Sequence, residues 1–550
     1  MSTSSTKSSV NKRQVSSFAA DRNQSREATA EVSERFWRIG ALLIMALAAF
    51  LRVYNLNLVP LHHDEGVNGN FLVKLVRDGV YQYDPANYHG PTLYYFSAFV
   101  PWLLKILFGT AARETYGLTT ISIRLVPAIF GLGTIWLVLL LRKHIGSIAA
   151  LSAALLLGVS PGAVYLSRYF IHETLFVFFT LGIVVAMLRC FTERNPFYLL
   201  LAAASAALLF ATKETAIISA AVLLIAVAMT LLYVRVFKTK TASSARKKQK
   251  PSEQFSLSDF VYELGGPTNL AIWLLLAALV FVGLNIVFYS SFFTNWPKGV
   301  YDALKTFEIW RKTGKEAHVH PFITYVIWLF KQESSLLFLG SFGAIASLFA
   351  RKRPVALFCS LWAFGLIAAY SLIAYKTPWL VLNFIVPLAI AAGYAIQTIY
   401  EFDGKQLRLP AVVVLAAVCV SSYQMVDLNF VNYDNDDVYY VYVYAHTKRD
   451  TIELVKQIDN IARTHTQGGT GITIMSADYW PLPWYLRNYS RVGYYGRLTQ
   501  TVEPIVIANE NQREEVEGIL GPGYHLVPSG SGTGAFVLRP GVDLLLYASP

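Results

Sequence analysis

The chain has 550 residues, of which 54% are hydrophobic and only 15% are charged. An average soluble protein carries about 25% charged residues, so this composition excludes an ordinary soluble domain. The net charge of +12 is no sign of nucleic-acid binding, because lysine and arginine collect in the cytoplasmic loops of membrane proteins. The three cysteines lie inside apolar runs, without zinc-type spacing, and this favours buried thiols over disulfides.

The N-terminal segment is polar over residues 1–35 and is predicted to be a disordered tail. Up to Arg38 it carries seven basic and four acidic residues, so we expect it in the cytoplasm. The apolar run that follows, residues 36–54, begins too far along the chain for a cleavable signal peptide. We therefore predict a retained first span, with residue 55 emerging on the outer side.

The apolar residues recur in runs of about 17–23, which suits the crossing of a bilayer core. About eleven spans are predicted, at residues 36–54, 121–141, 147–165, 175–189, 196–211, 216–233, 270–289, 336–350, 355–374, 380–400 and 411–425. In this topology the basic loops at Arg142, 235–250 and Arg351 all face the cytoplasm. If residues 92–108 also spanned, those loops would lie outside. We therefore predict a surface or re-entrant helix at 92–108.

The predicted fold is a mainly α polytopic bundle with external juxtamembrane helices and a small extracytoplasmic α/β domain. Its parts are a tail (1–35), a membrane domain (36–426) that contains an external loop (55–120) and a basic cytoplasmic linker (235–268), and a C-terminal domain (427–550). A surface helix is expected at 67–76. In the C-terminal domain, helices are expected at 450–464 and 511–520 and strands at 471–476, 503–508 and 534–538.

Four ionisable clusters fall on the outer side: His62-His63-Asp64-Glu65, Arg168 with His172 and Glu173, Lys213 with Glu214, and Lys376. Ionisable residues beside membrane spans are costly, so four on one side indicate a shared external cavity. Carboxylates are general bases toward a hydroxyl, and cations bind phosphate. Such a site suits a substrate that is part lipid, part phosphate and part sugar.

Structural alternatives stay open for these residues. Glu173 could pair with Arg168, and Lys213 with Glu214 could form an ion pair at a helix end. His63, Asp64 and Glu65 are candidate ligands for a divalent metal, although adjacent residues need a special turn to face one ion. Otherwise no cofactor or metal is required. Tyr88-His89-Gly90-Pro91 is either a sugar contact or a structural loop.

Four motifs carry a family resemblance: His62-His63-Asp64-Glu65, Tyr83-Asp84-Pro85 with Tyr88-His89-Gly90-Pro91, Tyr375-Lys376-Thr377-Pro378-Trp379, and Trp480-Pro481-Leu482-Pro483-Trp484-Tyr485-Leu486. They resemble the GT-C superfamily of membrane glycosyltransferases, which includes the protein O-mannosyltransferases and the aminoarabinose lipid A transferases. Within it they are most similar to an archaeal and bacterial branch named for association with flippase activity. The oligosaccharyltransferase Trp-Trp-Asp motif is missing from the C-terminal domain, which argues against a peptide asparagine acceptor.

The resemblance implies a polyprenyl-phosphate-linked sugar donor in the membrane lipids, and inverting transfer on the outer face to a glycan, lipid or protein acceptor. Asp64 matches the superfamily's first-loop acidic residue. The expected roles are catalysis by Asp64 and Glu65, binding of the donor phosphate by Arg168, Lys376 and Lys213, and substrate binding by His63, Tyr88, His89, Glu173, Trp379, Trp480 and Trp484. The alternatives are a flippase or flippase partner for lipid-linked sugars, and a non-catalytic binding subunit.

Overall fold

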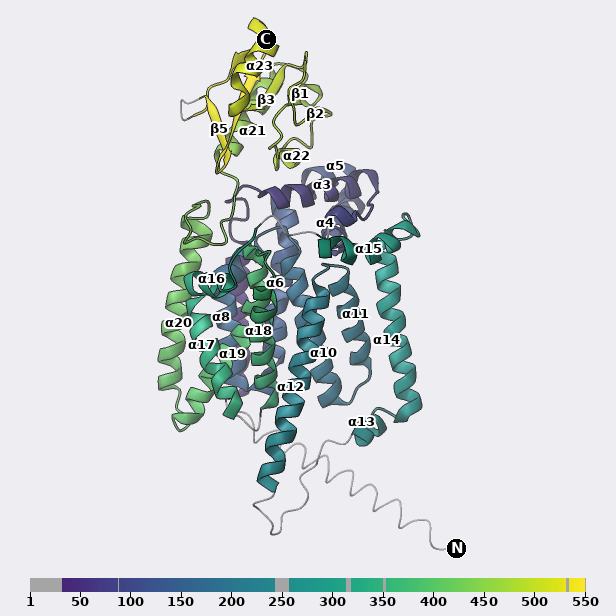
Figure 1. Cartoon of the computed structure of the whole chain (residues 1–550), viewed down its shortest axis with the longest axis vertical. Helices are drawn as coiled ribbons and strands as arrows, with labels where there is room; N and C mark the ends of the chain where they lie inside the picture. Colours follow the sequence, from purple (N-terminus) through teal and green to yellow (C-terminus); the bar gives the residue numbers. More distant parts are fainter. Residues whose placement is uncertain are drawn as a thin grey trace.

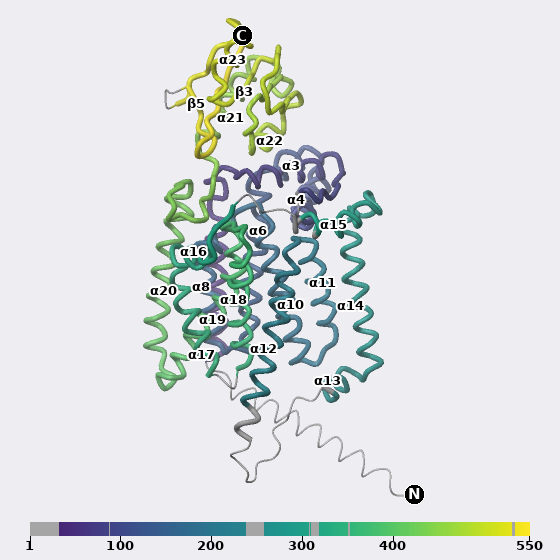
Figure 2. The backbone as a smooth tube through the Cα atoms, viewed as in Figure 1, coloured from purple at the N-terminus to yellow at the C-terminus, as the bar shows by residue number. Residues whose placement is uncertain are grey.

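The chain is represented by a computed structural model that describes residues 32–87, 89–242, 257–312, 318–349, 353–530 and 534–549. Long helices lie side by side in one bundle, shorter helices cover one end of it, and a small domain with a sheet stands beyond them (Figure 1). The chain reaches this domain only through the segment that follows the last bundle helix (Figure 2).

Among the described residues, eight helices are long and apolar enough to cross a membrane. They are α2 (Glu34–Val53), α6 (Thr120–Leu140), α10 (Glu173–Glu193), α12 (Ala216–Ala242), α14 (Gly266–Tyr289), α18 (Pro354–Leu372), α19 (Leu382–Phe402) and α20 (Arg408–Val426). A bent pair, α8 (Ser147–Val159) and α9 (Pro161–Ser167), adds a ninth if it counts as one span. The predicted helical, multi-spanning fold is confirmed.

Three further apolar helices are shorter: α4 (Thr92–Phe108), α11 (Phe197–Phe210) and α17 (Ser334–Phe349). Two of them, α11 and α17, belong to the eleven spans expected from the sequence, and α4 is the helix expected not to span. Eleven crossings therefore require α8 with α9, α11 and α17 to cross as well, and that number stays a prediction.

Helix α19 lies at the centre of the bundle, and 94% of its apolar stretch is buried inside the protein. It packs against α17 and α8 through glycines that leave no room for a side chain. A Cβ at Gly343 would lie 1.9 Å from the carbonyl oxygen of Ala391, and one at Gly393 would lie 2.2 Å from that of Ala149. Small residues let membrane helices approach backbone to backbone, so these contacts hold the middle of the bundle together.

Basic residues gather at the end of the bundle where α2 begins. Arg142 Nη1 lies 2.7 Å from Glu34 Oε2, and its guanidinium stacks 4.3 Å from the ring of Trp37. Arg353 Nη1 donates to the carbonyl of Ile145 over 2.9 Å. The parts that were expected in the cytoplasm thus lie together. Residues 1–31, most of the basic linker, Arg351 and Lys352 are outside the described residues.

The opposite end of the bundle carries shorter helices. These are α3 (His63–Asp78), α5 (Thr110–Thr115), α15 (Lys298–Lys312) and α16 (Thr324–Gln332), with α4 beside α3 (Figure 1). Small elements complete the connections: η1 (Pro85–Asn87), α7 (Arg142–Ile145), α13 (Leu257–Glu263), η2 (Pro378–Val381) and η3 (Asp427–Val431). Helix α3 begins four residues before the predicted 67–76, so the tetrad lies at a helix start.

Six strands of the described C-terminal residues form one sheet in the order β2-β1-β3-β6-β4, with β5 also paired to β6. They are β1 (Gly471–Ile474), β2 (Arg491–Tyr494), β3 (Ile505–Asn509), β4 (His525–Leu526), β5 (Ala535–Arg539) and β6 (Val542–Ala548), with α21 (Asp450–Arg463), α22 (Leu482–Tyr485), η4 (Gln467–Gly469), η5 (Glu510–Gln512), η6 (Gly521–Gly523) and α23 (Arg513–Leu520). Strand β1 pairs in parallel with β2 and β3, whereas β6 is antiparallel to its partners. The predicted α/β domain is confirmed.

The C-terminal domain rests on α3 through the loop that contains α22. A Cβ at Gly66 would lie 2.5 Å from Cβ of Pro481, and one at Gly69 would lie 2.6 Å from Cε3 of Trp484. The Tyr485 hydroxyl accepts a hydrogen bond from the Leu61 amide at 2.8 Å. Two glycines one turn apart on α3 therefore make the flat face on which the domain is seated.

Candidate functional site

The start of α3 is defined by a histidine cap. His62 precedes the helix, and its Nδ1 accepts a hydrogen bond from the Asp64 amide at 3.1 Å. Because Nδ1 is an acceptor, the neutral ring carries its proton on Nε2, which lies 3.1 Å from the Tyr444 carbonyl oxygen and donates to it. The tetrad is thus tied to the segment that leads into the C-terminal domain.

Glu65 is fully buried, and both of its carboxylate oxygens have hydrogen-bond partners. It forms a bidentate pair with Arg124, with Nε to Oε1 at 2.8 Å and Nη2 to Oε2 at 2.6 Å. It also accepts from the amides of His62 at 3.0 Å and Phe170 at 2.8 Å. Four accepted hydrogen bonds and no exposure are unsuited to a base that meets a substrate. The geometry argues against the catalytic role predicted for Glu65 and favours a positioning role.

Arg124 completes this anchor from α6. Its remaining N–H groups donate to the carbonyl oxygens of Leu56 at 2.8 Å, Val59 at 2.9 Å and Pro60 at 3.2 Å. All five guanidinium donors are therefore used. One arginine holds both the connection that follows α2 and the start of α3, so the position of Asp64 is fixed by a buried ion pair.

Asp64 differs from its neighbour. Its side chain is 42% exposed, and its Oδ2 lies 3.9 Å from His62 Nδ1. The carboxylate stands at the N-terminus of α3, where the helix dipole stabilises negative charge. Within the tetrad, Asp64 is the carboxylate that a substrate hydroxyl can reach.

An aromatic and histidine wall faces the start of α3. The ring of His62 lies 5.4 Å from those of Tyr169 and His446 and 6.2 Å from that of Trp379. The wall continues from Trp379 to Tyr444 at 6.3 Å. Burial lowers the pKa of His446 well below its usual range, so that ring is neutral at pH 7. Segments far apart in the chain thus meet around His62, two residues before Asp64.

A second polar cluster lies between α10 and α12. The Lys213 ammonium forms an ion pair with Glu173 Oε1, and His89 Nδ1 lies 3.3 Å from Glu214 Oε2. Backbone bridging between His89 and Lys213 closes the loop onto this segment. Burial alone would lower the pKa of Lys213, but Glu173 and Glu214 raise it above its usual value. Lys213 therefore stays charged. It pairs with Glu173, so this pair replaces the two alternatives of Glu173 with Arg168 and Lys213 with Glu214.

The His89 loop is further held by His172. Its Nε2 lies 3.0 Å from the carbonyl oxygen of Gly90, and the rings of His89 and His172 are 5.0 Å apart. Burial lowers the pKa of His172 well below the ordinary value. The neutral ring thus donates to Gly90, and the loop expected to contact sugar is also a structural element. Tyr88 lies outside the described residues.

Tyr375 connects the two polar clusters. Burial raises the pKa of its phenol, and the charges of Lys213, Asp64 and Glu173 all act on it. His318 packs 5.4 Å from this ring and shares a 2.8 Å hydrogen bond with the Tyr444 hydroxyl. The charges of both polar clusters therefore act on one phenol, that of Tyr375.

Arg168, which was predicted to bind the donor phosphate, has its donors bound to backbone carbonyls of the protein. Arg168 Nη1 donates to the carbonyls of Leu51 at 3.1 Å and Tyr54 at 2.6 Å, and Nη2 donates to Asn55 at 3.0 Å. Arg168 therefore caps the C-terminus of α2, and these contacts argue against its predicted phosphate role. Burial lowers its pKa to about 10, at which it is still charged at pH 7.

Lys376, two residues before η2, is also buried. Its ammonium donates to the carbonyl oxygens of His320 and Ile373 and lies 5.9 Å from the Tyr325 ring centroid. Burial lowers its pKa. Two of its three donors are used, and the side chain is 1% exposed, so a phosphate would have to enter the protein to meet the third N–H.

The predicted tryptophans have different surroundings. Trp379 belongs to the wall around His62, and Trp480 is partly exposed with its ring 6.1 Å from that of His63. Trp484 is 1% exposed and fills the contact with Gly69. The predicted substrate contact of Trp484 therefore conflicts with its burial, and this ring seats the domain instead.

Sequence reasoning missed several members of the site. Arg124, His318, Tyr444 and His446 were not singled out, and Tyr375 was quoted only as part of a motif. Arg124 did carry a signal, because a lone arginine in an apolar run needs a buried acid. The other three lie in polar stretches, where single histidines and tyrosines do not stand out.

No group of three His, Cys, Asp or Glu side chains in the described part of the chain is arranged to hold a metal ion. In the candidate set, Asp64 is exposed whereas Glu65 is fully buried against Arg124. The two carboxylates thus lie in different environments, and they do not form one ligand set with His63.

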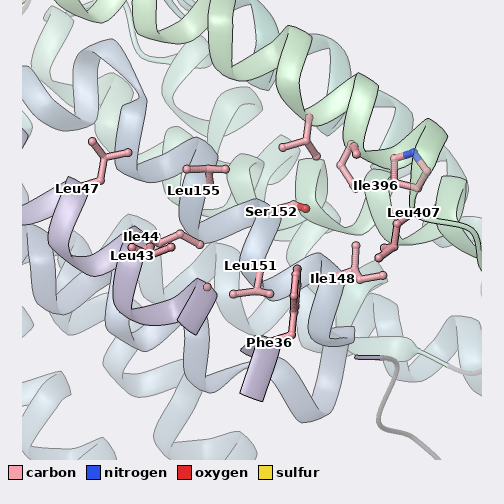
Figure 3. A pocket seen from close by; sticks show the side chains of 14 residues that line it. Phe36, Leu43, Ile44, Leu47, Ile148, Leu151, Ser152, Leu155, Ile396 and Leu407 are labelled. Carbon is pink, nitrogen blue, oxygen red and sulfur yellow. The ribbon is translucent and has the colours of Figure 1, made fainter. Parts of the chain in front are cut away.

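An apolar groove of about 410 Å³ lies away from this region, between α2, α8, α19 and α20 (Figure 3). Its lining from α2 begins at Phe36, at the end of the helix opposite Asp64, and includes Leu43 and Leu47. Ser152 is its one polar lining residue, and none can titrate. The groove suits hydrocarbon chains and offers nothing for group transfer.

Solved structures with a similar fold include ArnT from Cupriavidus metallidurans in the apo state, with a TM-score of 0.61 and 16% identity over 92% of this chain and 97% of that one. ArnT bound to undecaprenyl phosphate gives a TM-score of 0.56 and 15% identity over 94% and 98% of the two chains. AglB from Archaeoglobus fulgidus, in complex with an inhibitory peptide and a dolichol-phosphate, gives 0.49 and 13% over 90% and 74%.

The family of dolichyl-phosphate-mannose-protein mannosyltransferases matches residues 97–245. This segment contains Arg168, Glu173 and Lys213 but not Asp64. No curated protein sequence matches the chain significantly. Together with the ArnT likeness, the family match confirms the GT-C fold that the four motifs predicted.

Proposed function

We propose that this GT-C chain is a glycosyltransferase that moves a sugar from a polyprenyl-phosphate carrier to an acceptor hydroxyl. The observation that carries the proposal is the contrast at the start of α3. Glu65 is locked by Arg124, whereas the adjacent Asp64 is 42% exposed, and the charges of Asp64, Lys213 and Glu173 all act on the Tyr375 phenol. This contrast supports Asp64 as the base and Lys213 as the cation that serves the phosphate.

In the proposed reaction, Asp64 accepts the proton of the acceptor hydroxyl. The hydroxyl oxygen forms a bond to the first carbon of the sugar while the bond from that carbon to the phosphate oxygen breaks. Attack opposite the leaving group inverts the configuration, and the electron pair leaves with the polyprenyl phosphate. General base catalysis of this kind contributes roughly 10²- to 10⁴-fold to the rate.

Lys213 and Lys376 are the proposed partners of the leaving phosphate. Glu173 holds Lys213 in its charged form, and the ammonium keeps N–H groups beyond the one that Glu173 accepts. A buried cation stabilises negative charge that develops during the reaction more strongly than an exposed one does. Arg168 is not part of the proposed phosphate site, because its side chain caps the C-terminus of α2.

The carrier lipid follows from the likeness to ArnT, whose structure contains undecaprenyl phosphate. We place the site on the outer side of the membrane, because Asp64 lies at the end of α2 opposite the basic loops. The acceptor stays within the predicted range of glycan, lipid or protein. Transfer to peptide asparagine is not part of the proposal.

Asp64→Asn tests the base. The variant keeps the size of the side chain and the helix cap but removes the proton acceptor, so transfer from undecaprenyl-phosphate-linked sugars should fall at least about 100-fold. The assay measures loss of donor and gain of product with purified protein in liposomes. Asp450→Asn, at the start of α21, is the matched control and should transfer normally.

Full activity of Asp64→Asn would refute the proposed base. The same liposomes also separate the flippase alternative. Donor that reaches the other leaflet unchanged, with no product formed, would mean translocation, and the transferase proposal would then be wrong.

A further inference from the structure

A row of aromatic side chains leads from the start of α3 onto the C-terminal domain. The ring of His63 lies 6.1 Å from that of Trp480, Trp480 lies 5.7 Å from Tyr479, and Tyr479 lies 5.1 Å from Tyr494. We call these four residues the aromatic row. Tyr494 is 36% exposed, and Trp480 and Tyr479 are partly exposed. The row is therefore accessible beside Asp64.

Burial in the hydrophobic core does not account for the whole row. Tyr479 packs at the edge of the domain core, which fixes its ring. Trp480 and Tyr494 belong to none of the hydrophobic clusters of the described residues. Trp484, only four residues after Trp480, is fully inserted against Gly69. One tryptophan of the motif is thus fully inserted into the seat, whereas Trp480 stays partly exposed, with its Cε3 3.4 Å from the Cβ position of Gly66.

Polar groups border the row. Asp478 and Arg539 form an ion pair in which the side chains are 48% and 17% exposed. Arg539 Nη1 also donates to the Trp480 carbonyl at 3.3 Å. The charges of both residues act on His63, so the pair lies beside the start of the row. Exposed carboxylate oxygens and a guanidinium edge are hydrogen-bonding partners for hydroxyl groups.

Hydrogen bonds between α3 and the loop that carries Trp480 fix the position of the aromatic row relative to Asp64. Arg77 of α3 donates to the carbonyl of Arg487 and, at 2.8 Å, to Asn488 Oδ1. Arg487 returns a 2.6 Å hydrogen bond to the carbonyl of Leu118. These contacts and the glycine seat fix the loop that carries Trp480, and a ring bound on it would lie at a set position relative to Asp64.

From these observations we propose that the aromatic row is a carbohydrate-binding platform for a glycan acceptor. Apolar C–H faces of pyranose rings would stack on Trp480 and Tyr494, while their hydroxyls bond to Asp478 and Arg539. This proposal rests on the proposed transferase function and narrows its acceptor to a glycan. The donor phosphate stays assigned to Lys213 and Lys376, which are not part of the row.

The test uses purified full-length protein on an array of immobilised oligosaccharides built from pyranoses. Wild type should bind a subset of them, and Trp480→Ala and Tyr494→Ala should each weaken binding about tenfold, since one well-placed aromatic contact contributes about that much. Tyr495→Ala is the matched control. Tyr495 is exposed and follows directly after β2, where side chains alternate between the two faces, so it should point away from Tyr494 and the variant should bind as wild type does.

Asp64→Asn should retain glycan binding while it loses transfer, and this separates the platform from the transferase. If Asp64→Asn still transfers sugar, the proposed function fails whatever the array reports. If wild type binds no glycan, or if Trp480→Ala binds as wild type with an unchanged melting temperature, the platform is refuted. Displacement of the bound oligosaccharide by undecaprenyl-phosphate-linked hexose would assign the row to the donor and overturn the acceptor proposal.

Discussion

At the scale of single residues, adjacent carboxylates in one tetrad have opposite roles. Glu65 is fully buried and accepts four hydrogen bonds, whereas Asp64 is 42% exposed. The difference follows from helix geometry, since consecutive residues of α3 point about 100° apart. One carboxylate therefore faces Arg124 in the bundle, and the next faces the site.

The buried pair gives a stability prediction. Arg124→Leu leaves the Glu65 carboxylate buried without its partner, and loss of one member of such a pair costs about 3–5 kcal/mol. The thermal unfolding midpoint of purified protein should fall clearly. The double variant Glu65→Leu with Arg124→Leu should recover part of the loss, because no uncompensated charge remains.

Arg513→Leu serves as the control for this pair. Arg513 and Glu510 have side chains that are 31% and 40% exposed, so their pair should contribute at most about 1 kcal/mol. If Arg124→Leu changed the unfolding midpoint no more than Arg513→Leu does, the anchoring role of the pair would be wrong.

At the scale of elements, α3 has two functions on its two sides. Its first turn presents Asp64, and its glycine face receives the C-terminal domain through Pro481 and Trp484. Any shift of the domain would therefore move Trp480 relative to Asp64. The start of α3 is held by the His62 cap and by the pair of Arg124 with Glu65, so Asp64 itself should stay in place.

Gly69→Ala tests this seat. The added methyl would lie 2.6 Å from Trp484 Cε3, and overpacking of this kind costs about 1–3 kcal/mol. We expect a lower unfolding midpoint and slower sugar transfer. Gly518→Ala is the control, because that glycine lies inside α23 with nothing within 4 Å of its Cβ position. Replacing such a glycine should stabilise the protein by about 0.5–1 kcal/mol. Equal effects of the two substitutions would contradict the seat.

At the scale of the whole molecule, the bundle has a basic end and an end that carries the candidate site. Arg142 and Arg353 lie where α2 begins, and Asp64 lies beyond its other terminus. The positive-inside rule predicts an orientation with the small domain outside. In that orientation, the proposed lipid-linked donor would reach the site from the outer leaflet.

Cysteine labelling in intact cells checks the orientation. In a background with Cys190, Cys359 and Cys419 changed to serine, we expect Asn511→Cys in the C-terminal domain to react with a membrane-impermeant maleimide. Lys143→Cys, beside Arg142, should react only after the cells are permeabilised. The opposite pattern would invert the proposed topology.

The sequence predicted the membrane fold, the α/β domain and the importance of the tetrad, because hydropathy and strand patterning are local properties. The start of α21 and the positions of β1, β3 and β5 came close to their predicted ranges. Strands β2, β4 and β6 were missed. Strand β2 is exposed at both ends and carries no apolar run, and β4 has only two residues, whereas β6 (Val542–Ala548) is an apolar strand that the sequence analysis did not predict.

The roles of the charged residues could not be predicted in the same way. Arg168 and Trp484 carry the right chemistry for a substrate, yet one caps α2 and the other seats the domain. Their partners are 114 residues away for Arg168 and lie across a domain contact for Trp484. A side chain that is already paired has little left for a ligand, and pairing depends on distant packing.

By itself, therefore, the sequence determined that the chain has the helices of a multi-spanning membrane protein and which four clusters carry ionisable groups. Only the tertiary structure decided which of those groups stays accessible. Arg124 reaches Glu65 across 59 residues, and His62 reaches Tyr444 across 382. The physical reason is that burial cost is set by neighbours in space, so a carboxylate beside arginine becomes an anchor, whereas one beside open solvent stays accessible for the proposed role of a base.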